Sequence, residues 1–197
     1  MESKTIIFIG PQGSGKGTQI DSLIEKLKEV DSERSITHIQ TGKPFRELAA
    51  KGGFAADVVK QLITTGALVP NVLTNALVVQ DFVTQHVEDA HVIFDGFPRD
   101  TEQTKVCDDL FKLFSRNNLE IVYLDTAADV VMERMLKRGR DDDTEEVIAN
   151  RLQQYHQSTE PLLDYYRSRP NTTVHTVNGA GTEEEVQAEI FAALNIS

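Results

Sequence analysis

The 197-residue chain contains only one cysteine, Cys107, so no internal disulfide can form. The same count excludes a structural zinc site built on paired cysteine thiolates. Histidines are also few and show no spacing typical of metal ligands; they are His38, His86, His91, His156 and His175. We therefore expect a protein of the reducing cytoplasm that holds no zinc.

Basic residues are in short supply, with 20 Lys and Arg against 31 Asp and Glu and a formal net charge of -11. This balance works against a broad surface for nucleic acid or for an anionic membrane. The sequence also lacks long apolar runs. The run nearest the N-terminus, residues 5–9, is too short for a signal segment or a membrane span. We expect no targeting segment, no nucleic-acid partner and no membrane attachment.

The sequence shows neither an internal repeat nor a low-complexity tract, which excludes a solenoid and a disordered linker. Its length and its 40% apolar content suffice for one substantial hydrophobic core, but not for two full-sized domains. We expect a single domain over residues 1–197 with small appendages, acting as a monomer.

Short apolar runs rich in β-branched residues predict five buried strands, at residues 5–9, 36–39, 91–94, 120–124 and 173–177. Helical spacing predicts helices at residues 16–30, 72–87, 101–115, 127–137, 145–168 and 183–194. Strands that alternate with helices are typical of an α/β fold with a parallel sheet covered on both faces. In such folds ligands bind beyond the carboxyl ends of the strands.

Two segments interrupt this alternation. Residues 41–66 carry two short helical patterns around Gly52 and Gly53 with no strand between them, which predicts an inserted helical flap. Residues 138–144 form a charged turn in which Gly139 can end one helix, and Asp143 or Thr144 can cap the next. The alternative is that both segments are ordinary surface connections. The remaining residues, 1–40, 67–137 and 145–197, would form the core.

A glycine-rich segment, Gly10-Pro-Gln-Gly-Ser-Gly-Lys-Gly-Thr18, follows the first predicted strand and opens the first long helix. Glycines permit backbone conformations in which successive N–H groups point inward at phosphate oxygens. Lys16 adds a mobile cation, and the helix N-terminus adds about half a positive charge. The segment therefore predicts a phosphate-binding loop.

The Gly-Lys-Gly-Thr-Gln sequence at residues 15–19 resembles that of nucleoside monophosphate kinases, and most closely that of adenylate kinases. It departs from the general phosphate-loop pattern because Gly17 separates Lys16 from Thr18. The resemblance is completed by Asp95-Gly96-Phe97-Pro98-Arg99, which matches the segment that binds the acceptor nucleotide in that family. The implied fold is a P-loop NTPase fold with a five-stranded parallel sheet, and the implied reaction is reversible, magnesium-dependent phosphoryl transfer from ATP to AMP by direct in-line attack.

The resemblance assigns roles to individual residues. The ATP-binding set it implies is Gly13, Ser14, Gly15, Lys16, Gly17, Thr18, Arg134, Arg138 and Gly179. The AMP-binding set is Thr41, Gly42, Arg46, Val69, Gly96, Arg99, Gln103, Arg140 and Arg151. The catalytic set is Lys16, Arg99, Arg138, Arg140 and Arg151, while Asp95 would hold Mg²⁺ through water. Residues 41–66 would be the AMP-binding flap and residues 138–144 a very short lid without zinc.

Thr41 and Gln103 favour AMP, since pyrimidine-specific relatives commonly carry Ala and Asn at these places. Arg134 would stack on the donor adenine, and Asp142 and Asp143 would hold the lid arginines in place. One departure concerns the flap, where the family's usual acidic residue after Thr41-Gly42 is replaced by Lys43.

Two other functions stay open from the sequence. One is a UMP/CMP-type nucleoside monophosphate kinase, which comparison of rates on different monophosphates would reveal. The other is a nucleotide-binding sensor with little transfer activity, favoured only by the short lid and by Lys43.

Overall fold

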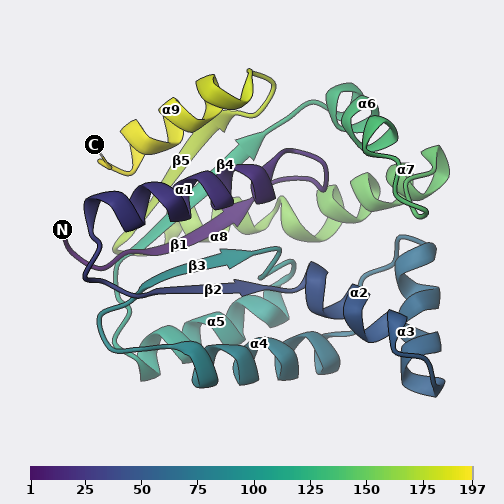
Figure 1. Ribbon diagram of the computed structural model, residues 1–197, viewed down its shortest axis with the longest axis horizontal. Coiled ribbons are helices and arrows are strands. Elements are labelled where there is room, and N and C mark those ends of the chain that lie inside the picture. The colour runs from purple at the N-terminus through teal and green to yellow at the C-terminus, as the bar shows by residue number, and fades with distance from the viewer. Residues whose placement is uncertain (197) are drawn as a thin grey trace.

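The computed structural model describes residues 1–196 and contains a five-stranded parallel sheet in the order β2-β3-β1-β4-β5 (Figure 1). Its strands are β1 (Thr5–Ile9), β2 (Ile36–Gln40), β3 (His91–Asp95), β4 (Leu119–Asp125) and β5 (Thr172–Asn178). Each of the five predicted strands is present, displaced by no more than one residue at either end. Strand β1 lies in the centre of the sheet, and all five of its residues are buried. A strand covered on both faces reads as a continuous apolar run, as residues 5–9 do.

Helices cover both faces of the sheet (Figure 1). They are α1 (Lys16–Val30), α2 (Gly42–Ala50), α3 (Phe54–Thr64), α4 (Asn71–Gln85), α5 (Thr101–Leu113), α6 (Ala128–Arg138), α7 (Glu145–Gln154), α8 (Leu162–Ser168) and α9 (Glu183–Ala193). Helices α1 and α9 pack on one face, where Leu23 and Ile190 join Ile6 in one buried cluster. Helices α4, α5 and α8 pack on the other, where Phe82 and Tyr166 join Ile7. Alternate residues of β1 thus point into two separate cores.

The single helix predicted over residues 145–168 is wrong. The chain instead forms α7, then a π-helical turn η1 (Tyr155–Thr159), and then α8. The wider turn is closed by the Glu160 N–H, which donates to the Tyr155 carbonyl at 2.9 Å. Pro161 follows and has no N–H to donate, so the regular hydrogen-bond ladder cannot run through it. Helical spacing of the side chains persists across this break, which is why the pattern did not reveal it.

Both irregular segments have the expected local structure. Residues 41–66 form α2 and α3 with no strand between them, and they lie at the end of the sheet toward which the strands point (Figure 1). Gly139 ends α6, and the Thr144 hydroxyl caps α7 by accepting a hydrogen bond from the Val147 N–H at 3.3 Å. The connection between α6 and α7 is therefore only residues 139–144.

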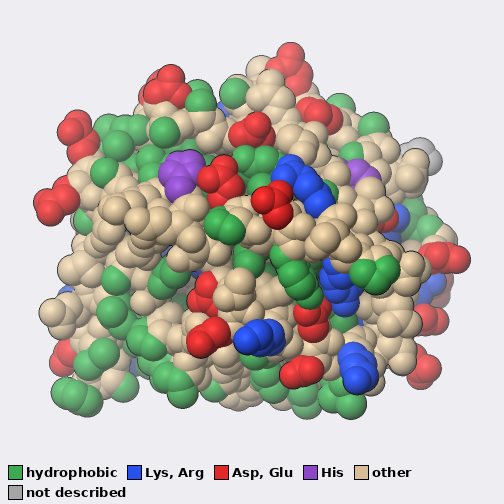
Figure 2. Space-filling model, turned by 180° about the vertical axis from the view of Figure 1, so that it is seen from behind, with side chains coloured by type: hydrophobic (Ala, Val, Ile, Leu, Met, Phe, Trp, Pro, Cys, Tyr) green, Lys and Arg blue, Asp and Glu red, His purple; other side chains and the backbone are tan. Residues whose placement is uncertain are grey.

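Acidic, basic and apolar side chains are interspersed on the face that Figure 2 shows. Within residues 1–196, no helix combines the length and the apolar character that crossing a membrane requires.

Candidate active site

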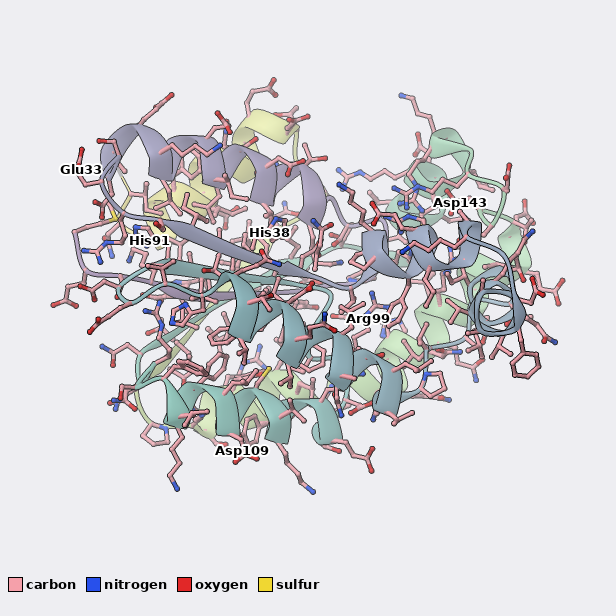
Figure 3. All side chains as sticks on the ribbon, turned by 60° about the horizontal axis from the view of Figure 1, so that its bottom comes forward. Glu33, His38, His91, Arg99, Asp109 and Asp143 are labelled. Carbon is pink, nitrogen blue, oxygen red and sulfur yellow. The ribbon has the colours of Figure 1, made fainter. Side chains whose placement is uncertain are left out.

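A cavity of about 920 Å³ opens at the carboxyl ends of the strands. Its wall is formed by the glycine-rich loop, by α2 and the end of α3, and by residues of α6 and α7. Figure 3 shows Arg99 beside the end of the sheet, with Asp143 across from it in the connection between α6 and α7. Every residue that the sequence assigned to ATP, AMP, catalysis or magnesium lines this cavity. The volume lies at the upper end of the range for ligand pockets, which is about 300–1,000 Å³.

The glycine-rich loop is folded around the side chain of Lys16. Its ammonium group donates to the carbonyls of Gly10 and Pro11, both at 2.8 Å, and to the Ser14 hydroxyl at 3.4 Å. Burial lowers the pKa of Lys16 to about 8, although the Asp95 carboxylate opposes this shift. The loop thus holds its cation at the N-terminus of α1, where the helix dipole also favours an anion.

Gly13 is required by the shape of this loop. Its φ is +93°, which side chains rarely permit, and a Cβ atom there would lie 2.6 Å from Cγ of Met135. The loop therefore packs against α6, the helix that carries Arg134 and Arg138.

The acceptor segment begins where β3 ends. Asp95 is the last residue of β3, and the Arg99 guanidinium turns back to donate to the Gly96 carbonyl at 2.8 Å. The Thr41 hydroxyl donates to the same carbonyl at 3.1 Å. Burial lowers the pKa of Arg99, and the Asp95 carboxylate works in the opposite direction. A guanidinium held in this way remains charged and offers its other N–H groups to a phosphate.

Gln103 lies in the first turn of α5 and is almost completely buried, with 1% of its surface exposed. Its Oε1 accepts a hydrogen bond from the Arg99 N–H, and its Nε2 donates to Oδ1 of Asn71, both at 2.8 Å. The amide is fixed at both ends while its side chain lines the cavity.

The arginines of α6 and α7 are gathered by Asp143, whose side chain is fully buried. Arg138 donates to both of its carboxylate oxygens, at 2.9 and 2.8 Å, and Arg151 donates to one of them at 3.3 Å. Arg151 also pairs with Asp142. Burial alone would raise the pKa of Asp143, but hydrogen bonds and charge from Arg138 outweigh it and hold the pKa below its ordinary value. The predicted pairing of Asp142 and Asp143 with the lid arginines is confirmed for Arg138 and Arg151, whereas Arg140 meets Asp143 through its backbone N–H, which donates at 3.3 Å.

Among the described residues, Arg140 and Arg134 take no part in these ion pairs. The pKa of Arg140 is lowered by burial and by the neighbouring charges of Arg138 and Arg46. Arg134 donates to the carbonyls of Gly179, at 2.6 Å, and Gly181, at 3.3 Å. It therefore ties α6 to the loop after β5, and a flat guanidinium in this position is available for stacking on a base.

The donor chemistry near Asp95 fits Mg²⁺. Among residues 1–196 there is no cluster of three His, Cys, Asp or Glu side chains that could hold a metal alone. Mg²⁺ keeps several waters and is commonly held by one or two carboxylates together with substrate phosphates. A single carboxylate facing a phosphate-binding loop satisfies that requirement.

Comparisons with known proteins identify the family to which this chain belongs. The family model described as "Adenylate kinase" matches residues 8–171. Adenylate kinase 1 of Nostoc sp. is 39% identical over 193 residues, which cover 96% of this chain and 97% of that protein. The chain belongs to the adenylate kinase family. The adenylate kinase of Mycolicibacterium vanbaalenii is 38% identical over 189 residues, covering 96% of this chain and 98% of that protein. That of Oenococcus oeni is 35% identical over 178 residues, 90% of this chain and 91% of that protein.

Polar residues that no sequence pattern marked also hold the segments around this cavity in place. Asn71 contacts Gln103, and Asn150 reaches the backbone after α3. The Thr159 hydroxyl, in the π-helical turn, donates to the Arg99 carbonyl at 2.8 Å. Each of these contacts joins segments at least 32 residues apart, so no local pattern marks them.

Proposed function

We propose that this chain catalyses the reversible transfer of the γ-phosphoryl group of ATP to AMP, giving two molecules of ADP. A single observation carries the proposal: one cavity holds both a phosphate-binding loop with its lysine and a separate arginine, Arg99, at the end of the neighbouring strand. Two phosphate-binding groups in one cavity suit two nucleotides whose phosphates meet.

The donor nucleotide would place its phosphates over residues 10–18. Backbone N–H groups of the loop and the Lys16 ammonium would neutralise its β- and γ-phosphates. Lys16 now bonds to two loop carbonyls, so it must move or share these contacts when a phosphate arrives. The base would lie toward Arg134 and the loop containing Gly179, which we propose as the donor base site.

The acceptor nucleotide would bind between α2 and the end of β3. We propose that residues 41–66 are the AMP-binding flap and that Arg46 and Arg99 hold the AMP phosphate, with Thr41, Gly42, Val69, Gly96 and Gln103 around the nucleoside. Arg140 and Arg151, from the other side of the cavity, would contact the phosphate that is being transferred.

Transfer needs no general base, because the AMP phosphate is already an anionic nucleophile. Catalysis then depends on alignment of the two phosphates and on neutralisation of the charge that spreads over the transferred group. Arg138, Arg140 and Arg151 would supply guanidinium groups, and those of Arg138 and Arg151 are already held by Asp142 and Asp143 before substrate binds. Residues 138–144 would form the lid that excludes water.

The family generally uses Mg²⁺ with ATP, and we propose that Asp95 holds the ion through water. An ion held there would supply positive charge that neutralises part of the charge on the ATP phosphates. That the protein holds no zinc and that it acts as a monomer remain predictions.

The proposal is tested by measuring ADP formed from ATP plus AMP by wild-type protein and by two variants, Lys16→Ala and Arg99→Ala. We expect both variants to fold and to lose at least about a hundredfold in kcat/KM, since each removes a charge that stabilises transferred phosphate. Near-normal turnover by either folded variant would refute its role, and no ADP from wild-type protein would refute the function.

A further inference from the structure

Beside the proposed acceptor site, a small network of side chains fixes which way the Gln103 amide faces. The network joins the first residue of α4, Asn71, to the first turn of α5. It comprises Asn71, Asp100, Glu102 and Gln103 together with the backbone N–H of Arg99.

The orientation of Asn71 follows from its two carboxylate neighbours. Its Nδ2 lies 2.9 Å from Oδ2 of Asp100 and 2.8 Å from Oε2 of Glu102. Ionised carboxylates only accept hydrogen bonds, so the nitrogen of Asn71 must face them and both of its protons are used. Its oxygen, Oδ1, must then face Gln103.

Two neighbours of the Gln103 side-chain amide require the same orientation of it. The Arg99 N–H is a donor, which requires Oε1 of Gln103 opposite it, and Oδ1 of Asn71 is an acceptor, which requires Nε2. Asp100 supports this arrangement because its other oxygen, Oδ1, accepts from the Gln103 backbone N–H at 2.9 Å and caps α5. A flipped amide would lose both side-chain hydrogen bonds.

The fixed amide keeps one N–H and one oxygen lone pair unused. A 6-aminopurine offers an amino donor at position 6 and an acceptor at N1, which complement these two groups. A 6-oxopurine offers the reverse, an oxygen acceptor at position 6 and a donor at N1. Against a fixed amide it would leave two polar contacts mismatched inside a buried site.

We propose that Asn71 is a positioning residue that locks Gln103 in the orientation that accepts 6-aminopurine monophosphates and rejects 6-oxopurine monophosphates. This inference rests on the proposed function, because it assigns Gln103 to the acceptor base. Asn71 acts only through Gln103, so its loss should change selectivity and KM for the acceptor more than kcat or the KM for ATP.

The test compares kcat/KM for AMP with kcat/KM for IMP, with ATP as donor and the nucleotide products separated by chromatography. We expect wild-type protein to prefer AMP by at least about a hundredfold, since a site built to hydrogen-bond one pattern strongly rejects the other. Asn71→Leu should lower this preference about five- to tenfold, the effect of one hydrogen bond. The ratio does not depend on the fraction of active protein.

Asn75→Leu is the matched control, one turn further along α4 and away from the cavity lining, and it should leave the preference unchanged. If Asn71→Leu does not fold, Glu102→Leu removes one of the two carboxylates that orient Asn71 and should lower the preference about two- to threefold. Wild-type protein that uses IMP within about threefold of AMP, or folded network variants with an unchanged ratio, would overturn the inference. Absence of turnover with both acceptors would instead defeat the proposed function.

Discussion

Asn150 of α7 donates a hydrogen bond of 2.7 Å to the carbonyl of Thr65, the residue that follows α3. Arg151, the next residue of α7, donates to the Ile63 carbonyl at 3.2 Å and also pairs with Asp142 and Asp143. The same helix therefore touches the proposed flap and supplies an arginine to the proposed lid. Helix α7 thus links the proposed flap on one side of the cavity to the proposed lid on the other.

Replacement of Asn150 by Ala should loosen the flap. The Thr65 carbonyl would lose its side-chain donor, and one hydrogen bond of about 1 kcal/mol corresponds to a roughly fivefold effect. We expect the KM for AMP to rise about three- to tenfold with the KM for ATP within about twofold, measured in steady-state assays. Gln153→Ala, at an exposed position of α7, serves as control. Equal increases in both KM values would contradict a contact specific to the flap.

Gly66 allows the close approach of the flap to α7. Its φ is +75°, and a Cβ atom would lie 3.0 Å from the Val147 carbonyl. Gly52 has the same φ with no atom within 4 Å of such a Cβ, so Gly52→Ala isolates the backbone penalty, about 1 kcal/mol. Gly66→Ala should lower the free energy of unfolding by about 1–2 kcal/mol more than Gly52→Ala, measured by urea denaturation. Equal losses in the two variants would show that the packing against α7 contributes nothing.

The affinity for ATP should depend on pH through Lys16. Its pKa of about 8 in the free protein means that it is charged below that pH and loses its proton above it. Bound phosphate favours the charged form, so affinity is full below about pH 8 and falls as the pH rises through this value. Calorimetric titration with ATP between about pH 7 and 9.5 should show this decline. Lys16→Ala should bind weakly with no such decline, and a pH-independent affinity of the wild-type protein would contradict the role.

Asp143→Asn should disturb both stability and catalysis. Removing the charge leaves Arg138 and Arg151 without their shared carboxylate, which should lower the free energy of unfolding by about 3 kcal/mol. We expect kcat to fall at least about tenfold because the guanidinium groups are no longer held in place. Urea denaturation and steady-state assays measure the two effects. Asp141→Asn, an exposed neighbour, should change neither.

Because the pKa of Asp143 is lowered in the folded protein, the stability that this residue contributes should depend on pH. A carboxyl whose pKa is lower in the folded state stabilises the fold at neutral pH, and that stabilisation is lost as the pH falls through the folded-state pKa. The difference in stability between wild-type protein and Asp143→Asn should therefore shrink on acidification. A constant difference would contradict the assignment.

The features that could be predicted from the sequence are those set by interactions between residues close together in the chain. The strand at residues 5–9 was predictable because complete burial leaves an uninterrupted apolar run. The loop around Lys16 was predictable because its hydrogen bonds span no more than six residues. The break at Tyr155–Thr159 was not, because the apolar periodicity continues through it and Pro161 alone marks it.

Contacts between distant segments could not be predicted either. Asn71 is an unremarkable first residue of a helix until α5 brings Gln103 against it, 32 residues later. Asn150 is likewise an ordinary polar residue of a helix when the sequence is considered alone. Its partner Thr65 lies 85 residues earlier. Such positions acquire their roles only when the sheet has brought the ends of its strands together.

The central claim is that two nucleotides bind in one cavity with their phosphates facing each other. Calorimetric titration with two adenosines joined through five phosphates tests this claim most directly. We predict one molecule bound per chain, competition with both ATP and AMP, and a large loss of affinity in Lys16→Ala and in Arg99→Ala. No binding to the wild-type protein, or competition with only one of the two nucleotides, would contradict the claim.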